Sequence, residues 1–404
     1  MERVFREHRA RMLAALVRAL GDFELAEDAL QDACALALDR WAATVPDDPV
    51  AWLLTVARNR AIDRLRRARA GREKQERADA DQPPPTRMTG FDDELLISVG
   101  DERLSLIFTC CHPALAQDVR VALTLQAVVG LTAGQIARVF LVGETTLAQR
   151  LVRAKRKIRD AGISLAVPAD HLLPDRLSGV LAVVYLIFTQ GYTTNPDAPE
   201  HQRLRAEAIR LGTLIAALMP DEPEALGLVA LLLLHNSRAA ARYSPSGDVV
   251  LLEDQDRDRW DRGEIVEALG VLDRALRHDA AGPYQLQAAI AALHAQAPST
   301  RDTDWPRIAA LYGELLTVTP SPVVALNHAV ALAMTDGPSA GLALIDRIDG
   351  LDRYHLWHAA RADLLRRLDR TDEAAAAYRR AHELAANPAD RRYLARRLLD
   401  LDTT

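Results

Sequence analysis

The sequence predicts an all-α protein. Ala and Leu dominate its 404 residues, apolar residues recur at intervals of three and four, and β-branched runs are short. The length favours two or three domains, and no apolar run reaches the roughly 20 residues that a membrane helix requires. The first residues carry no hydrophobic signal segment, and three cysteines form no disulfide framework. We therefore expect a cytoplasmic protein.

Three helices are predicted in the first part of the chain. Gly21 ends the first apolar stripe, and the carboxylate of Asp22 suits the N-cap of the helix that follows. The third helix has Trp52 and Leu53 on an apolar face and arginine over most of the other face. The predicted helices cover residues 12–20, 23–41 and about 50–69.

Two proline-containing stretches divide the rest of the chain. Residues 70–92 are polar with Pro83–Pro85 in the middle, which is typical of a semi-extended linker. Pro168 and Pro174 mark a second boundary. We expect a first domain at 1–69, the linker at 70–92, a second domain at 93–165 and a longer helical region at 173–404.

Weak internal repetition runs through the third region. Ala340 and Ala374 begin similar patterns and lie 34 residues apart, which is the tetratricopeptide period. Ala374, Tyr378 and Ala381 keep the small–large–small spacing of a tetratricopeptide second helix. Because a single hairpin cannot bury its apolar face alone, the pattern predicts a stack of helical hairpins. A generic helical bundle is the alternative.

Basic residues concentrate in two blocks, although the net charge of the chain is −6. Arg58–Arg77 holds nine basic and three acidic residues, and Arg150–Arg159 holds six basic residues in ten positions. Such blocks are typical of contacts with polyanions. The alternative at each block is an Arg-rich helix face that is only solvated surface.

Residues 130–159 predict a helix-turn-helix. Thr132 can cap a short first helix, and Leu141–Gly143 form a tight turn before the second. Ala137 is small enough for a close crossing, and Leu147 follows ten residues later, as the motif requires. The second helix would enter the major groove with its N-terminal half facing the bases. An ordinary αα-hairpin shares this spacing.

Three motifs resemble those of a bacterial extracytoplasmic-function sigma factor of the sigma-70 family, group 4. In chain order they are FELAEDALQDACALALDRW (Phe23–Trp41), AWLLTVARNRAIDRLRR (Ala51–Arg67) and GLTAGQIARVFLVGETTLAQRLVRAKRKI (130–158). The region from 173 onward resembles the long tetratricopeptide-like extension of one sigma subgroup, through RLSGVLAVVYLIFTQGY (Arg176–Tyr192) and LLEDQDRDRWD (Leu251–Asp261).

The resemblance implies contacts for the first domain. The exposed side of the second helix would bind the coiled coil of the RNA polymerase β′ subunit, where carboxylates suit cations of the partner. The third helix would face the −10 element, its arginines holding phosphates and a displaced strand and Asn59 bonding a base. Trp52 could stack on a base, although its helical phase favours core packing. The loop Ala42–Pro49 sits where the family holds a flipped base. The candidate residues are Asp28, Gln31 and Asp32 for core polymerase, and Trp52, Arg58, Asn59, Arg60, Arg64, Arg66 and Arg67 for the −10 element.

The second domain would read the −35 element. Gln149 suits adenine and Arg153 suits guanine in the major groove, and Thr146 would contact a phosphate. The basic residues that follow would serve phosphates or the polymerase β flap. The candidate −35 residues are Thr146, Gln149, Arg150, Arg153, Lys155, Arg156 and Lys157.

Other features of the sequence favour structural explanations. Cys110, Cys111 and His112 have no CxxC or HxxxH partner for zinc, so we expect a buried helix start before Pro113. The acidic run at 253–261 lacks the Gly spacing of an EF-hand and reads as a loop that contacts another domain. No Gly-rich phosphate loop, HExxH or GxSxG motif is present. We therefore predict no metal site, no cofactor and no enzyme activity.

These observations favour a sigma factor that binds RNA polymerase core and promoter DNA and is regulated by its helical extension. A regulatory protein or ligand on the extension is a further expected partner, and no membrane is expected. One alternative is a stand-alone helix-turn-helix regulator with a tetratricopeptide sensor, which would have no use for the two N-terminal motifs. The other is a helical enzyme or scaffold with incidental basic regions, against which the lack of catalytic motifs argues.

Overall fold

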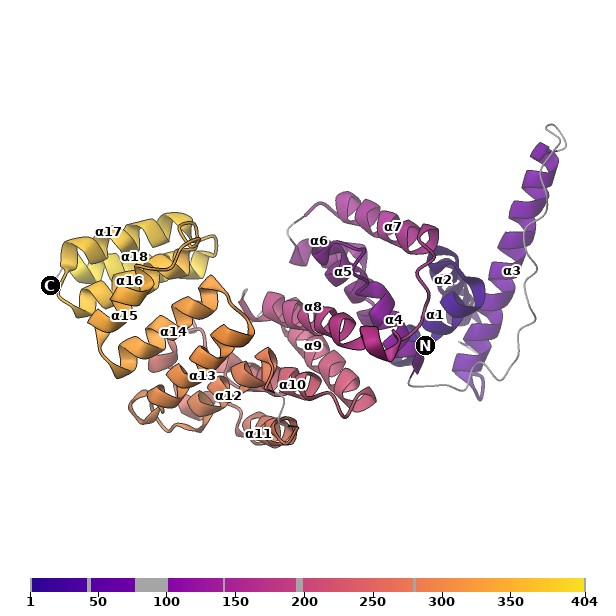
Figure 1. Cartoon of the computed structure of the whole chain (residues 1–404). Coiled ribbons are helices and arrows are strands. Elements are labelled where there is room, and N and C mark those ends of the chain that lie inside the picture. Colours follow the sequence, from indigo (N-terminus) through magenta and orange to yellow (C-terminus); the bar gives the residue numbers. More distant parts are fainter. Residues whose placement is uncertain are drawn as a thin grey trace. The chain divides into compact units, whose positions relative to one another are not determined.

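The computed structural model of the chain describes residues 2–41, 45–76, 101–140, 142–193, 199–278 and 281–402. Side chains at some helix positions within these ranges, Arg67 among them, fall outside the description. The described residues form α-helices, 3₁₀ turns and one π-helical turn, with a single isolated bridge between Tyr243 and Val249. The all-α prediction is confirmed. The chain divides into two compact units, Met1–Leu186 and Ile187–Thr404 (Figure 1).

The first unit begins with three helices that pack together: α1 (Glu2–Leu20), α2 (Phe23–Arg40) and α3 (Pro49–Glu76). As predicted, Asp22 caps α2, because its Oδ1 accepts the N–H groups of Glu24 and Leu25 at 2.9 and 3.0 Å. α3 continues past the expected end at Arg69, since residues 70–76 contain no proline and several strong helix formers. Residues 77–92 of the predicted linker and 42–44 of the predicted loop lie outside the described residues.

Four helices and a π-helical turn follow in the first unit. They are α4 (Asp101–Cys110), α5 (Gln117–Thr124), the π-turn η2 (Leu125–Val129), α6 (Ala133–Val139) and α7 (Glu144–Asp160). Thr132 caps α6 as predicted, and it does so reciprocally with Gln135 through bonds of 2.9 and 3.2 Å. Cys110 and Cys111 are buried, but they lie at the end of α4 rather than at a helix start. The helix stops there because Pro113 cannot continue it.

One helix, α8 (Leu173–Thr193), runs across the division between the two units. Pro174 does not interrupt it, because a proline in the first helical turn lacks only an N–H that has no partner within the helix. Arg176 donates to the carbonyl of Phe108 at 2.8 Å in the first unit. Arg242 donates to the carbonyl of Tyr192 at 2.7 Å in the second. The two ends of α8 therefore contribute to different units.

The second unit continues the chain with helices joined by turns. They are α9 (Pro199–Leu218), α10 (Pro223–Asn236), α11 (Arg262–Leu276), α12 (Pro283–Gln296), α13 (Trp305–Val318), α14 (Pro322–Thr335), α15 (Pro338–Ile345), α16 (His355–Arg367), α17 (Thr371–Leu384) and α18 (Pro388–Asp402). From α12 onward each helix packs against the next. Ala374, Tyr378 and Ala381 are all buried in α17, in agreement with the tetratricopeptide-like spacing.

Candidate nucleic-acid and polymerase interface

The predicted core-binding surface on α2 lies beside a predicted −10 residue of α3. Asp28 and Gln31 are exposed and Asp32 is half-buried. Arg64 bridges both aspartates, with its Nη1 2.7 Å from Asp28 Oδ2 and its Nη2 2.8 Å from Asp32 Oδ2. The structure thus joins two candidate sites that the sequence treated as separate.

The other candidate −10 residues follow the length of α3. Asn59, Arg60 and Arg66 are exposed, and Arg58 is half-buried. The half-buried ring of Trp52 meets Trp41 edge-on, with centroids 5.5 Å apart. This contact agrees with the core packing that its helical phase favours. The side chain of Arg67 lies outside the described residues.

α6 and α7 cross as the helix-turn-helix motif requires. Ile136, Ala137 and Leu147 are buried at the crossing. The N–H of Val142 donates to the carbonyl of Ala137 at 3.0 Å and closes the turn. Leu141, in the middle of that turn, lies outside the described residues.

The outward face of α7 carries most of the candidate −35 residues. Two of them are tied to neighbouring segments: Arg150 pairs with Asp118 of α5 at 3.1 Å, and Lys157 donates to the carbonyl of Ala114 at 2.6 Å. Both remain on the surface, so their charges still contribute to a positive potential there. The other exposed candidates are Thr146, Gln149, Arg153 and Arg156.

Lys155 differs from the other candidates because its side chain is only 8% exposed. Its Nζ pairs with the carboxylate of Glu27 on α2. Arg9 of α1 binds the same carboxylate, with Nη2 2.8 Å from Oε1. A contact between Lys155 and a phosphate therefore requires this pair to open, and it stays a prediction.

Arg9, Glu27 and Lys155, which we call the charged clasp, join the predicted first and second domains. Arg9 also donates to the carbonyls of Gln126 and Ala127 in η2, where the π-helical turn disturbs the regular ladder of backbone bonds. Burial lowers the pKa of the Arg9 guanidinium, and the charge of Glu27 opposes that shift. The sequence analysis missed the clasp. The available signal was Glu27 itself, a carboxylate one turn after Phe23 on an apolar helix face.

The cysteines are held as neutral thiols. Burial raises the pKa of Cys111 to about 11 and that of Cys110 well above its ordinary value. Burial also raises the pKa of Cys34 to about 11. A reactive cysteine needs a lowered thiol pKa, because the thiolate is the nucleophile.

Within the described residues, no group of three or more His, Cys, Asp or Glu side chains is placed to hold a metal ion. The acidic run instead caps helices, since Asp261 Oδ1 accepts the N–H of Glu264 at the start of α11.

Comparison with known proteins identifies the regions that carry these surfaces. Residues 4–71 match the family model of sigma-70 region 2, and residues 105–158 match that of sigma-70 region 4. The ECF RNA polymerase sigma factor SigK of Mycobacterium bovis is 30% identical over 162 residues, which are 39% of this chain and 82% of SigK. The chain belongs to the extracytoplasmic-function (ECF) sigma factors. This family consists of transcription initiation factors rather than enzymes.

Other relatives show how far the similarity of this sigma factor extends. The probable ECF RNA polymerase sigma factor SigI of Mycobacterium tuberculosis is 29% identical over 174 residues, 43% of this chain and 59% of SigI. An uncharacterized protein of Rhizobium meliloti is 44% identical over 398 residues, 96% of this chain and 92% of that protein. Residues 176–276 of the sigma factor match a family of unknown function, DUF6596. None of its described helices combines the length and apolar character of a membrane crossing.

Proposed function

We propose that this sigma factor binds core RNA polymerase and directs initiation at promoters with −35 and −10 elements. The observation that carries the proposal is the position of two polar, cationic helix surfaces. One lies on α3 within the region 2 match, and the other lies on α7 within the region 4 match. Cationic side chains on both surfaces suit phosphates, and the exposed amides of Asn59 and Gln149 suit base edges.

The −35 element would be read by the exposed residues of α7. Gln149 and Arg153 are one helical turn apart and both exposed, which places them on one face of the recognition helix. A change of either to Ala should relax the preference at one base position, by about 1–3 kcal/mol. Arg156, by contrast, should contribute to binding of any sequence. Binding to promoter libraries measured over a series of salt concentrations separates the two roles, because phosphate contacts weaken as salt rises.

The ion pairs of Arg64 suggest that binding of polymerase and of DNA are coupled. When cations of the β′ subunit bind Asp28 and Asp32, they compete with Arg64 for both carboxylates. Arg64 would then be free to hold a phosphate of the −10 element. Core binding would in this way complete the DNA surface on α3.

This coupling predicts an unusual effect of Arg64→Gln. We expect weaker opening of promoter DNA but core affinity that is higher by a factor of about two to five, because an exposed pair is worth up to about 1 kcal/mol. Arg66→Gln is the matched control: Arg66 is exposed on the same helix, and the described structure shows no ion pair at its side chain. It should weaken opening without raising core affinity. Lower core affinity in Arg64→Gln would contradict the coupling.

We further propose that the helical extension regulates initiation through α8. This helix is buried at Leu177 and Val180 in the first unit and at Ile187 and Phe188 in the second. A change in the extension could thus reach the unit that holds the charged clasp. Lys155 can contact DNA only when the charged clasp opens. A change in the stability of the charged clasp would therefore change promoter binding.

Transcription in vitro with sigma-free core polymerase on a promoter library tests both proposals. The comparison is between the full chain and a chain ending at Thr193, which retains α8. Initiation at a defined promoter set supports the sigma role, and a changed level in the shortened chain supports regulation. Equal activity of the two chains removes the regulatory proposal. Binding to duplex DNA without initiation by either chain would indicate a stand-alone regulator.

A further inference from the structure

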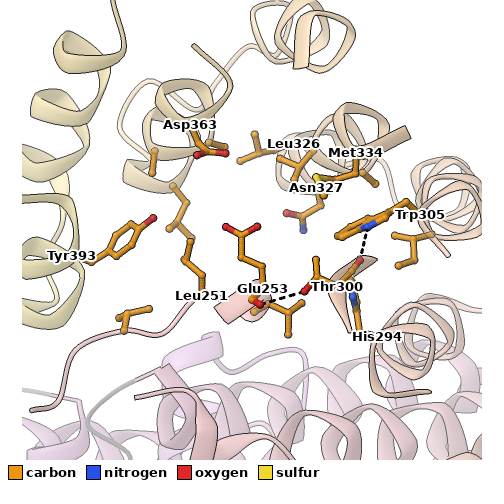
Figure 2. A pocket seen from close by; sticks show the side chains of 18 of the residues that line it. Leu251, Glu253, His294, Thr300, Trp305, Leu326, Asn327, Met334, Asp363 and Tyr393 are labelled. Atoms are coloured by element: carbon orange, nitrogen blue, oxygen red, sulfur yellow. Dashed lines mark hydrogen bonds between the residues drawn. The ribbon is translucent and has the colours of Figure 1, made fainter. Parts of the chain in front are cut away.

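The second unit contains a cavity of about 450 Å³ on one side of its helical stack (Figure 2). Helices α12, α13, α14, α16 and α18 line it, whereas α15 and α17 contribute no lining residue. A further wall is the segment Val249–Arg257, which contains the 3₁₀ turn Leu252–Asp254 and which we call the strap. A hydrogen-bonded turn at the start of the strap is fixed to α18, since Asp248 pairs with Arg392 at 2.6 Å. The volume lies in the range of sites that hold small organic molecules.

Aromatic and aliphatic side chains form a prearranged apolar wall. The indole N–H of Trp305 donates to the carbonyl of Thr300 at 3.3 Å, and its ring meets His294 edge-on at 5.2 Å. Figure 2 shows Trp305 at one side of the cavity and Tyr393 at the other, with Leu326 and Met334 above. Trp305 is held from two sides and presents a defined surface to a ligand. When a ligand binds to such a wall, the side chains lose little conformational entropy.

The two arginines that line the cavity already have partners. Arg257 donates to the carbonyl of Ala297 at 2.7 Å and stacks over Trp260 at 4.7 Å. Arg367 is 2.7 Å from Asp363 and donates to the sulfur of Met334 at 3.3 Å. Both guanidinium groups therefore donate to the protein's own groups, and they leave few N–H donors for an anionic ligand.

Glu253 of the strap has a more distant partner. Its side chain is 39% exposed and makes no carboxylate hydrogen bond within the described residues, and its ion pair with Arg367 Nη2 is long, at 3.9 Å. Figure 2 shows this carboxylate and the amide of Asn327 directed into the same space between Trp305 and Tyr393. A ligand with a cationic group and an apolar part suits this arrangement. Its cation would pair with the Glu253 carboxylate, and its apolar part would fill the cavity along the wall.

We propose that this cavity binds a small organic cation, an ammonium or guanidinium group on an apolar or aromatic body. The cationic nitrogen sits between the Glu253 carboxylate and the oxygen of the Asn327 amide. The body lies along Trp305, Met334 and Leu326. As an input to transcription the site rests on the proposed regulatory function, but binding itself is independent of polymerase and promoter.

Isothermal titration of the full chain with three probes of similar shape tests the ligand class. They are phenethylamine, a cation at neutral pH; 2-phenylethanol, its neutral counterpart; and 3-phenylpropionate, an anion. We expect phenethylamine to bind at least about tenfold more tightly than either of the others, because only it can pair with Glu253. Equal binding of the alcohol, tighter binding of the anion, or no binding of phenethylamine overturns the proposal.

Two variants then locate the site. Glu253→Gln keeps the size of the side chain and should weaken phenethylamine binding about tenfold. The matched control is Glu314→Gln on α13, because Glu314 lies outside the cavity and faces Arg307 at a similar distance, 4.0 Å. It should bind the probe as the parent chain does. Unchanged affinity in Glu253→Gln, or an equal loss in both variants, contradicts the assignment. Since these titrations contain no polymerase or DNA, their failure is distinct from failure of the sigma role.

Discussion

A buried carboxylate, that of Glu27, connects region 2 and region 4 of this sigma factor. Glu27 and both of its partners have side chains no more than 10% exposed. A buried carboxylate is costly without cations, and two buried cations are costly without a carboxylate. The three side chains therefore favour one relative position of α1, α2 and α7, the position in which all of them are paired.

The clasp predicts a large effect of Glu27→Gln. Loss of the charge leaves Arg9 and Lys155 buried without a counter-ion, which should cost about 3–5 kcal/mol of stability in the first unit. Hydrogen exchange of the amides in α1, α2 and α7 of the full chain measures this locally. Asp118→Asn is the control, because the exposed pair with Arg150 should be worth less than about 1 kcal/mol. Equal protection in the two variants would show that the clasp does not hold the regions together.

Residues whose roles depend on neighbours in sequence could be predicted, whereas those that depend on distant contacts could not. The caps at Asp22 and Thr132 follow from bonds that span two or three residues. Lys155 stands among exposed basic residues in the sequence, and only its distant partner Glu27 explains why it is buried. The pairing of Arg64 with Asp28 likewise requires α2 and α3 to be packed together.

At the scale of elements, a close contact between helices α10 and α12 of the extension depends on a glycine. A Cβ atom at Gly227 of α10 would lie 2.7 Å from Gln285 Cγ and 2.8 Å from the Gln285 backbone nitrogen. One turn earlier, the carboxylate of Glu224 accepts the N–H groups of Tyr284 and Gln285 at 3.0 and 3.1 Å. α10 thereby supplies the N-terminal cap of α12.

Gly227→Ala should separate these helices and weaken the cap. We expect a loss of about 1–3 kcal/mol, since an added methyl group in a tight contact displaces the backbone. Gly270→Ala on α11 is the control, because a Cβ atom there meets no atom within 4 Å. That change should be neutral or stabilising by up to about 1 kcal/mol. Thermal unfolding compares the variants, and equal melting temperatures would show that α10 and α12 adjust without cost.

At the scale of the whole molecule, the sequence indicated the fold class and the order of the regions, while the domain limits stay predictions. Helix periodicity and local motifs were enough for an all-α chain with two sigma regions and a helical extension. The prolines suggested a boundary near 168–174, where α8 begins at Leu173, and the two compact units divide within α8, between Leu186 and Ile187. That division depends on contacts between residues far apart in the chain, and a sequence pattern does not contain this information.

The extension as a whole should be sensitive to acid. Burial lowers the pKa of His294 from 6.5 to about 4, with Arg238 and Arg257 adding to the shift. Burial also places the pKa of His235 well below 6.5, with Arg238 and Arg242 adding to it. Above pH 6.5 both rings are neutral in the folded and in the unfolded protein, so their protonation does not change the stability. Below that pH the unfolded chain binds protons that the folded chain excludes, so stability falls as the pH falls.

For His294 the expected slope is about 1 kcal/mol per pH unit between pH 6.5 and about 4, and His235 adds a slope of the same sign. His294→Gln removes one of the two groups and should make the decline shallower by that amount. His278→Gln, at an exposed position after α11, controls for the substitution itself. Denaturant unfolding at several pH values, with hydrogen exchange in α10 and α12 to assign the transition, gives the slopes. If His294→Gln and the parent chain decline equally, His294 is protonated in the folded extension, and its buried environment does not exclude the charge.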